Sequence, residues 1–155
     1  MIRTAFALTI LAGSLAGLLG PNSARAADPT YAVDRIDAFV AVGEKGTASV
    51  SITARGGWHL NAEAPLTLKL IPPPGVSVDK PKLGRADLAL SNETSARFDV
   101  GVVASEPGKK AIGAEAAFVL CREDACRPIK EKLTLSVEAA APGKTAPAPQ
   151  PAKKR

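Results

Sequence analysis

Apolar and polar residues alternate along much of the chain between residues 45 and 138, which is the period of a strand with one buried face. The longest run is residues 112–120, where Ile112, Phe118 and Leu120 fall on the same side of the predicted strand. Four more stretches share this period of two, at residues 48–54, 66–70, 98–102 and 133–137. The pattern therefore predicts at least five β-strands.

Turn-forming residues separate these strands. They are Gly56-Gly57, the run Pro72-Pro73-Pro74-Gly75, and Glu106-Pro107-Gly108-Lys109. Several short strands at this spacing predict an all-β fold, an immunoglobulin-like antiparallel β-sandwich. Residues 84–92 are ambiguous between a strand and a covering loop, and no helical pattern follows residue 26.

The first 26 residues have the pattern of a signal peptide. A short positive start at Arg3 precedes an apolar run from Ala5 to Leu19, and Ala24-Arg25-Ala26 has the small-x-small form of a cleavage site. The run is short and rich in Ala and Gly, so a membrane span is not expected. The sequence therefore predicts export to the bacterial periplasm, with a mature chain that begins near Ala27.

Residues 27–138 are expected to form one domain, followed by a disordered tail at residues 139–155. All 15 acidic residues lie in 27–138, with 14 of the 20 basic ones, so the domain has a net charge of −1 (14 − 15). The chain's overall positive charge lies in the signal and the tail, and a basic face for nucleic acid is not supported. The tail, rich in Ala, Pro and Lys, is expected to stay solvated or to contact anionic surfaces weakly.

Two cysteines are the only ones in the chain, in the segment Cys121-Arg122-Glu123-Asp124-Ala125-Cys126-Arg127-Pro128. Cys121 directly follows the longest predicted strand, and Cys126 precedes the last one. We therefore expect the pair at the mouth of a hairpin, at one end of the sandwich. A bond there would close a six-residue loop and would contribute roughly 2 kcal/mol by chain entropy.

The spacing of the cysteines leaves three interpretations open. A structural disulfide, a redox-active pair and a metal site are all compatible with two cysteines four residues apart. Zinc usually takes about four ligands, and His59 is the only histidine, so a metal site is the least supported. No nucleophilic triad, paired acid site or phosphate-binding loop is recognisable.

Two motifs resemble a known family. The cysteine segment is similar to the "C-x-x-x-x-C-x-P" hairpin of the N-terminal periplasmic domain of the thiol:disulfide interchange protein DsbD, and Gly57-Trp58-His59-Leu60-Asn61 is similar to a second motif of that family. The resemblance covers roughly residues 45–138. It implies an immunoglobulin-like fold in which the cysteine pair passes electrons between a membrane thiol reductant and periplasmic thioredoxin-fold proteins.

The resemblance also implies a role for each cysteine. Cys126 would form the mixed disulfide with the partner and Cys121 would resolve it, with no cofactor and no metal. The alternative is a periplasmic immunoglobulin-like binding module whose disulfide is purely structural. The family shields its cysteines with an aromatic cap loop, whereas residues 84–93 contain no aromatic residue. Either Leu88 or Leu90 would then serve as the cap, or the site would be unshielded.

Trp58 and His59 are the remaining candidates for a role at the site. Trp58 is expected to be a core aromatic beneath the sandwich. His59 is expected on the neighbouring face, where it could be a surface residue, a partner of Asn61 in holding the turn, or a proton donor near the cysteines.

Overall fold

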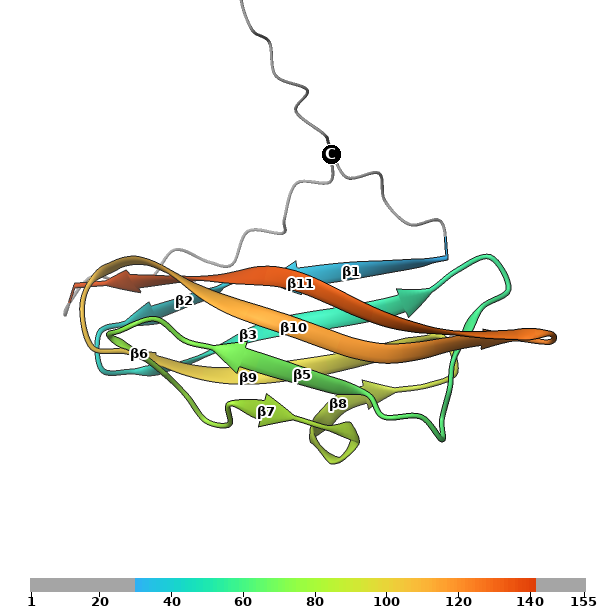
Figure 1. The fold of residues 1–155 in the computed structure, drawn as a ribbon. Helices are drawn as coiled ribbons and strands as arrows, with labels where there is room; N and C mark the ends of the chain where they lie inside the picture. Colours follow the sequence, from blue (N-terminus) through green and yellow to red (C-terminus); the bar gives the residue numbers. More distant parts are fainter. Residues whose placement is uncertain (1–29, 142–155) are drawn as a thin grey trace, which may run out of the picture.

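The computed structural model describes residues 30–141, which form two β-sheets packed face to face (Figure 1). The first sheet has the order β1-β3-β9-β6, with β8 also on β9; the second has the order β2-β11-β10-β5-β7, with β4 also on β10. All pairings are antiparallel except that of β2 with β11. The predicted immunoglobulin-like β-sandwich is therefore confirmed.

The strands of the first sheet are β1 (Tyr31–Ile36), β3 (Lys45–Ala54), β6 (Val76–Val78), β8 (Leu88–Ser91) and β9 (Ser95–Ala104). Those of the second sheet are β2 (Ala38–Ala41), β4 (His59–Leu60), β5 (Thr67–Ile71), β7 (Lys82–Leu83), β10 (Gly108–Arg122) and β11 (Ala125–Ala140). A single 3-10 turn, η1 (Arg85–Asp87), precedes β8.

The core lies between the sheets and follows the alternation in the sequence. In β10 every second residue from Ile112 to Leu120 is buried, while the residues between them are less so. The largest fully buried side chains come from both sheets, because each sheet turns one apolar face to the other. They include Ile52, Phe98 and Val100 from the first sheet and Leu68, Phe118 and Leu135 from the second.

The five predicted strands are all present, and two of them are longer than expected. β10 and β11 form one long hairpin whose two-residue turn is Glu123-Asp124, and β11 begins at Ala125 rather than near Leu133. Pairing with β10 extends β11 through residues that show no clear alternation of their own. β11 also continues to Ala140, two residues past the expected domain boundary at 138.

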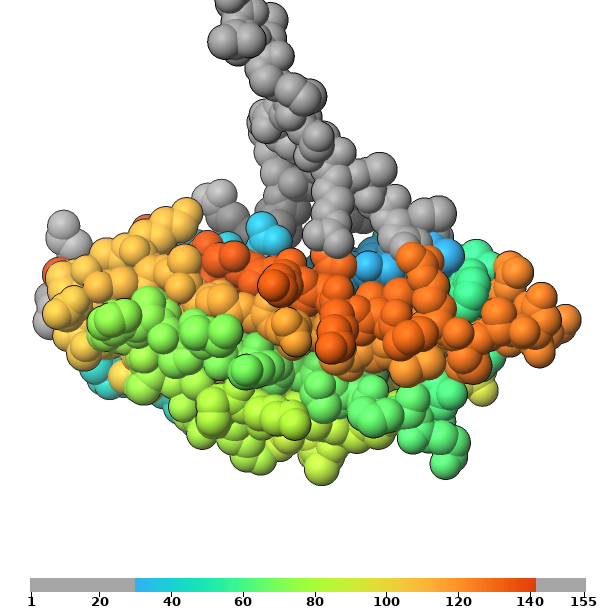
Figure 2. All heavy atoms as spheres, viewed as in Figure 1, coloured from blue at the N-terminus to red at the C-terminus, as the bar shows by residue number. Residues whose placement is uncertain are grey.

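The end of this hairpin projects from one end of the sandwich, as Figure 1 and the space-filling view in Figure 2 show. Tyr31 of β1 contacts the inner face of the hairpin. The Tyr31 hydroxyl donates a hydrogen bond to Glu131 at 2.8 Å, and the Tyr31 ring packs edge-on against the Phe118 ring, with the ring centroids 5.4 Å apart. These contacts link the first sheet to both strands of the hairpin, through Glu131 of β11 and Phe118 of β10.

The outer edge of β11 is paired over only part of its length. β2 pairs with Val137–Ala140, and the backbone N–H of Ser136 donates to the Asp37 carboxylate at 2.8 Å. In the register with β10, even-numbered residues of β11 direct their backbone groups away from β10, which is why Ser136 can make this bond. Among residues 30–141, no strand pairs with this edge from Cys126 to Thr134.

The signal peptide and residues 142–155 of the tail lie outside the described residues, so both stay predictions. In the segment that the structure describes, no helix has the length and apolar character needed to cross a membrane.

Candidate functional site: the Cys121–Cys126 disulfide

Cys121 and Cys126 form a disulfide between the last residues of β10 and the first of β11. The two residues are directly opposite in the hairpin, and their Cα atoms are 4.1 Å apart. This spacing is typical of a non-hydrogen-bonded antiparallel pair, in which facing side chains are closest. The backbone pairing therefore brings the two sulfur atoms together, at the end of the sandwich where the sequence predicts them.

The two cysteines differ sharply in exposure. Cys121 is only 5% exposed, whereas Cys126 is exposed along with every residue from Arg122 to Pro128. The difference arises because Cys121 lies on a central strand, between Cys126 of β11 and His59 of β4, while Cys126 lies on an edge strand. A nucleophile from solvent or from another protein can therefore reach Cys126 more easily than Cys121.

Pro128 fits this edge position. In β11 the backbone groups of even-numbered residues face away from β10. A backbone N–H at position 128 would therefore point outward and would not bond to β10, so a proline can stand there. The proline therefore removes no hydrogen bond from the hairpin and leaves the cysteine pairing intact.

Asn61 contacts the buried cysteine directly. Its Nδ2 lies 3.3 Å from Cys121 Sγ, and its Oδ1 accepts hydrogen bonds from the backbone N–H groups of Glu63 and Ala64. The backbone N–H of Asn61 donates to the Val119 carbonyl at 2.9 Å, which holds the residue beside β10. The sequence indicates only that Asn61 could help to hold a turn, and no local pattern predicts its contact with the sulfur.

His59 pairs with Cys121 across β4 and β10, so both side chains emerge on the outer face of the sheet. The imidazole is exposed. A role as proton donor near the cysteines stays a prediction.

Trp58 is partly buried and packs against the edge of the core, rather than lying beneath the sandwich as expected. The guanidinium of Arg122 lies over its ring, with Cζ 5.1 Å from the ring centroid. Arg122 Nε also pairs with Asp124 Oδ1 at 3.1 Å. Trp58 therefore anchors the tip of the hairpin, since it contacts the residue that follows Cys121.

Of the two alternatives for residues 84–93, a cap formed by Leu88 or Leu90 is not observed. Leu88 pairs with Phe98 on β9 of the first sheet and packs against the core, and Leu90 is 47% exposed. Pairing with β9 draws this segment into the first sheet, whereas both cysteines belong to the second. Residues 84–93 contact the site through Arg85 instead. Arg85 Nε donates to the Ala64 carbonyl at 2.9 Å, and Arg85 Nη2 donates to the carbonyl of Asn61, the residue whose side chain contacts Cys121.

Among residues 30–141, no three His, Cys, Asp or Glu side chains are grouped so that they could hold a metal ion. Cys121, Cys126 and His59 therefore do not form such a group, and the two sulfur atoms are bonded to each other.

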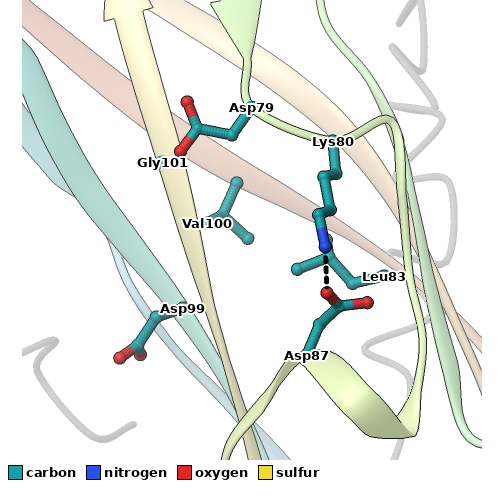
Figure 3. Close-up of a pocket in the computed structure, with 7 residues that line it drawn as sticks. All are labelled: Asp79, Lys80, Leu83, Asp87, Asp99, Val100 and Gly101. Carbon is teal, nitrogen blue, oxygen red and sulfur yellow. Dashed lines mark hydrogen bonds and ion pairs between the residues drawn. The ribbon is translucent and has the colours of Figure 1, made fainter.

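A shallow pocket lies away from the cysteines, between η1, β9 and the connection of β6 to β7 (Figure 3). Three carboxylates line it, and each has a partner: Asp79 pairs with Lys45, Asp87 with Lys80, and Asp99 with Arg97. Figure 3 shows the Lys80 ammonium and the Asp87 carboxylate joined across it. Because its charges are already compensated, the pocket offers no clear ligand site.

The described residues therefore form an immunoglobulin-like β-sandwich with one disulfide at the end of its longest hairpin. No protein-family profile and no curated protein matches the chain. Among solved structures it is similar to WR4, a C. elegans MSP family member, at 12% identity and a TM-score of 0.40, covering 73% of this chain and 100% of that one.

Two further structures have comparable similarity. A cohesin module from a Clostridium perfringens family 33 glycoside hydrolase matches at 9% identity and a TM-score of 0.39, covering 72% of this chain and 97% of that one. The ASH / PapD-like domain 7 of human CEP192 matches at 14% identity and a TM-score of 0.35, covering 84% and 97%. At these values the similarities assign no function.

Proposed function

We propose that this protein is a periplasmic thiol–disulfide exchange domain that passes electrons through Cys121 and Cys126 to or from a thioredoxin-fold partner. The observation that supports this most is the unequal exposure of the two sulfur-bearing residues. Cys126 is exposed on an edge strand, and Cys121 is 5% exposed beside it. The resemblance of the two sequence motifs to the N-terminal domain of DsbD favours the same proposal.

The exchange would proceed in two displacement steps. A partner thiolate attacks the exposed Cys126 Sγ, the Cys121–Cys126 bond breaks, and its electron pair leaves on Cys121 Sγ as a thiolate. The partner's second thiol then attacks the mixed disulfide, releases Cys126 as a thiolate, and leaves the partner oxidised and the domain reduced. In the reverse direction, Cys126 attacks the partner's disulfide and Cys121 resolves the intermediate.

The position of the bond supports exchange because the hairpin does not need it for closure. Cys121 and Cys126 are already opposite one another in a ladder of paired residues that runs back to Gly108 and Ala139. A bond that closes only six residues contributes roughly 2 kcal/mol. The domain can therefore stay folded in both redox states, as an exchange protein must.

The second candidate is a periplasmic binding module whose disulfide is structural. It is favoured by the same projecting hairpin, since the exposed residues Arg122 to Pro128 form a continuous contact surface for another protein. In this case the disulfide would fix the shape of the tip and would not open during function.

A trapping experiment shows which cysteine reacts with a partner, and reduction of the parent protein separates the two candidates. The probe is a thioredoxin that retains only the exposed cysteine of its active site, activated as a mixed disulfide with thionitrobenzoate. The Cys121→Ala variant should form a covalent complex with it rapidly through Cys126. The Cys126→Ala variant is the matched control, and it should react much more slowly because its remaining thiol is buried.

The parent protein gives the second measurement. Its disulfide should be reduced by catalytic amounts of thioredoxin while the domain stays folded. If the bond resists reduction until the domain unfolds, the disulfide is structural and the binding-module proposal is preferred, whichever variant traps the probe.

A further inference from the structure

The side-chain amide of Asn61 has a fixed orientation toward the buried sulfur. Its Oδ1 accepts the backbone N–H groups of Glu63 at 2.8 Å and Ala64 at 3.0 Å, which forms an Asx turn. A flipped amide would present two hydrogens to these two donors, so the assignment of oxygen and nitrogen follows from the hydrogen bonds themselves. The remaining group, Nδ2, is therefore the one that lies 3.3 Å from Cys121 Sγ.

The loop that carries Asn61 is held by Arg85. The guanidinium donates to the carbonyl oxygens of Asn61 and Ala64, on both sides of the Asx turn. The backbone of Asn61 is also bonded to Val119 on β10, two residues before Cys121. The amide is thus preorganised against the sulfur from two directions.

We propose that Asn61 assists thiol–disulfide exchange by donating a hydrogen bond to Cys121 Sγ when that sulfur leaves as a thiolate. This inference rests on the proposed function. A disulfide sulfur is a weak acceptor, whereas a thiolate carries a full charge and forms a much stronger hydrogen bond. The interaction therefore strengthens as the bond to Cys126 breaks, and an interaction that is stronger in the transition state accelerates the step.

The burial of Cys121 gives such a donor a larger effect. Because the residue is 5% exposed, its sulfur can gain little from water when it becomes charged. The nearest cation in sequence, Arg122, is engaged with Trp58 and Asp124. The Asn61 amide supplies in fixed form the stabilisation that water would supply to an exposed thiolate.

The test is the Asn61→Asp variant. An aspartate keeps the oxygen that accepts the Glu63 and Ala64 N–H groups, so the Asx turn is retained, but it puts a carboxylate oxygen in place of the N–H that faces the sulfur. We expect the oxidised protein to be reduced by glutathione about tenfold more slowly than the parent, because a hydrogen bond to a developing charge is lost and a carboxylate faces that charge instead.

The chain offers a matched control in Asn92. Its Oδ1 makes the same Asx turn, accepting the N–H groups of Thr94 at 3.0 Å and Ser95 at 2.7 Å, at an exposed position before β9. The Asn92→Asp variant should be reduced at the parental rate. If Asn61→Asp fails to fold, Asn61→Ser is used in its place, because a serine hydroxyl can hold the turn while being too short to reach the sulfur.

Three outcomes are distinguishable. Slower reduction of the Asn61 variant alone supports the inference. Equal rates for the parent, the Asn61 variant and the Asn92 variant overturn it but leave the proposed function standing. A parent disulfide that glutathione cannot reduce in the folded domain overturns both.

Discussion

Removal of the disulfide should leave the sandwich folded. The perturbation is the double variant Cys121→Ser/Cys126→Ser, in which the serine at 121 still offers an oxygen to the Asn61 amide. The bond closes six residues, for which chain entropy gives a contribution of roughly 2 kcal/mol. For a domain of this size, that loss corresponds to a decrease in melting temperature of about 8 °C. A domain stabilised by about 5–15 kcal/mol tolerates such a loss at room temperature.

The assay is thermal and urea unfolding of the mature chain, followed by circular dichroism. The oxidised parent, the parent with reductant and the double variant are compared under the same conditions. Reductant should move the parent onto the curve of the double variant and should leave the double variant unchanged. If either reduced form is unfolded at 25 °C, or loses more than about 4 kcal/mol, the disulfide carries the fold and the reasoning from loop length is refuted.

Two further predictions concern the rest of the sandwich. The Lys80 ammonium and the Gly84 N–H hold the pKa of Asp87 below its ordinary value of 3.8. The charged carboxylate therefore stabilises the fold fully above pH 3.8, and this stabilisation is lost as the pH falls through the lowered pKa of the folded state. Asp87→Asn should therefore lower the urea midpoint at pH 7 and match the parent in strong acid; a difference independent of pH would contradict this. At Gly46, an added Cβ would lie 2.1 Å from Val40 Cγ1, so Gly46→Ala should cost about 1–3 kcal/mol in thermal unfolding. The control is Gly84→Ala, where nothing lies within 4 Å, and an equal loss in both variants would argue against the steric explanation.

The main strands could be predicted because apolar residues alternate with less buried ones within each strand's own sequence. Val50 and Ile52 of β3, or Ile112 and Phe118 of β10, alternate with residues on the other face, and this local signal needs no knowledge of the partner strand. The N-terminal half of β11 has no such signal, since Cys126, Arg127 and Pro128 are all exposed. Its conformation depends on pairing with β10, which no local pattern encodes.

The candidate site divides in the same way. The position of Cys121 and Cys126 on one hairpin followed from their places at the ends of two strands, so it was predictable. The contact of Asn61 with Cys121 joins residues sixty positions apart, and it depends on how β4 aligns with β10. Of the two alternatives for the cap loop, a cap at Leu88 or Leu90 is not observed because residues 88–91 pair with β9, and neither leucine indicates which sheet its segment joins. Arg85, which holds the loop of Asn61, has no local sequence signal for that role.

The partly unpaired edge of β11 has a consequence for the behaviour of the protein in concentrated solution. An open strand edge invites a second chain to add its own strand, which is a common route to aggregation. Here the outward backbone position at Pro128 has no N–H to offer, and the one at Ser136 is occupied by Asp37. Lys130 and Lys132 place two positive charges between them, and a second copy aligned along this edge would bring like charges together. The strand that carries the exposed cysteine is therefore protected against self-association by its own sequence.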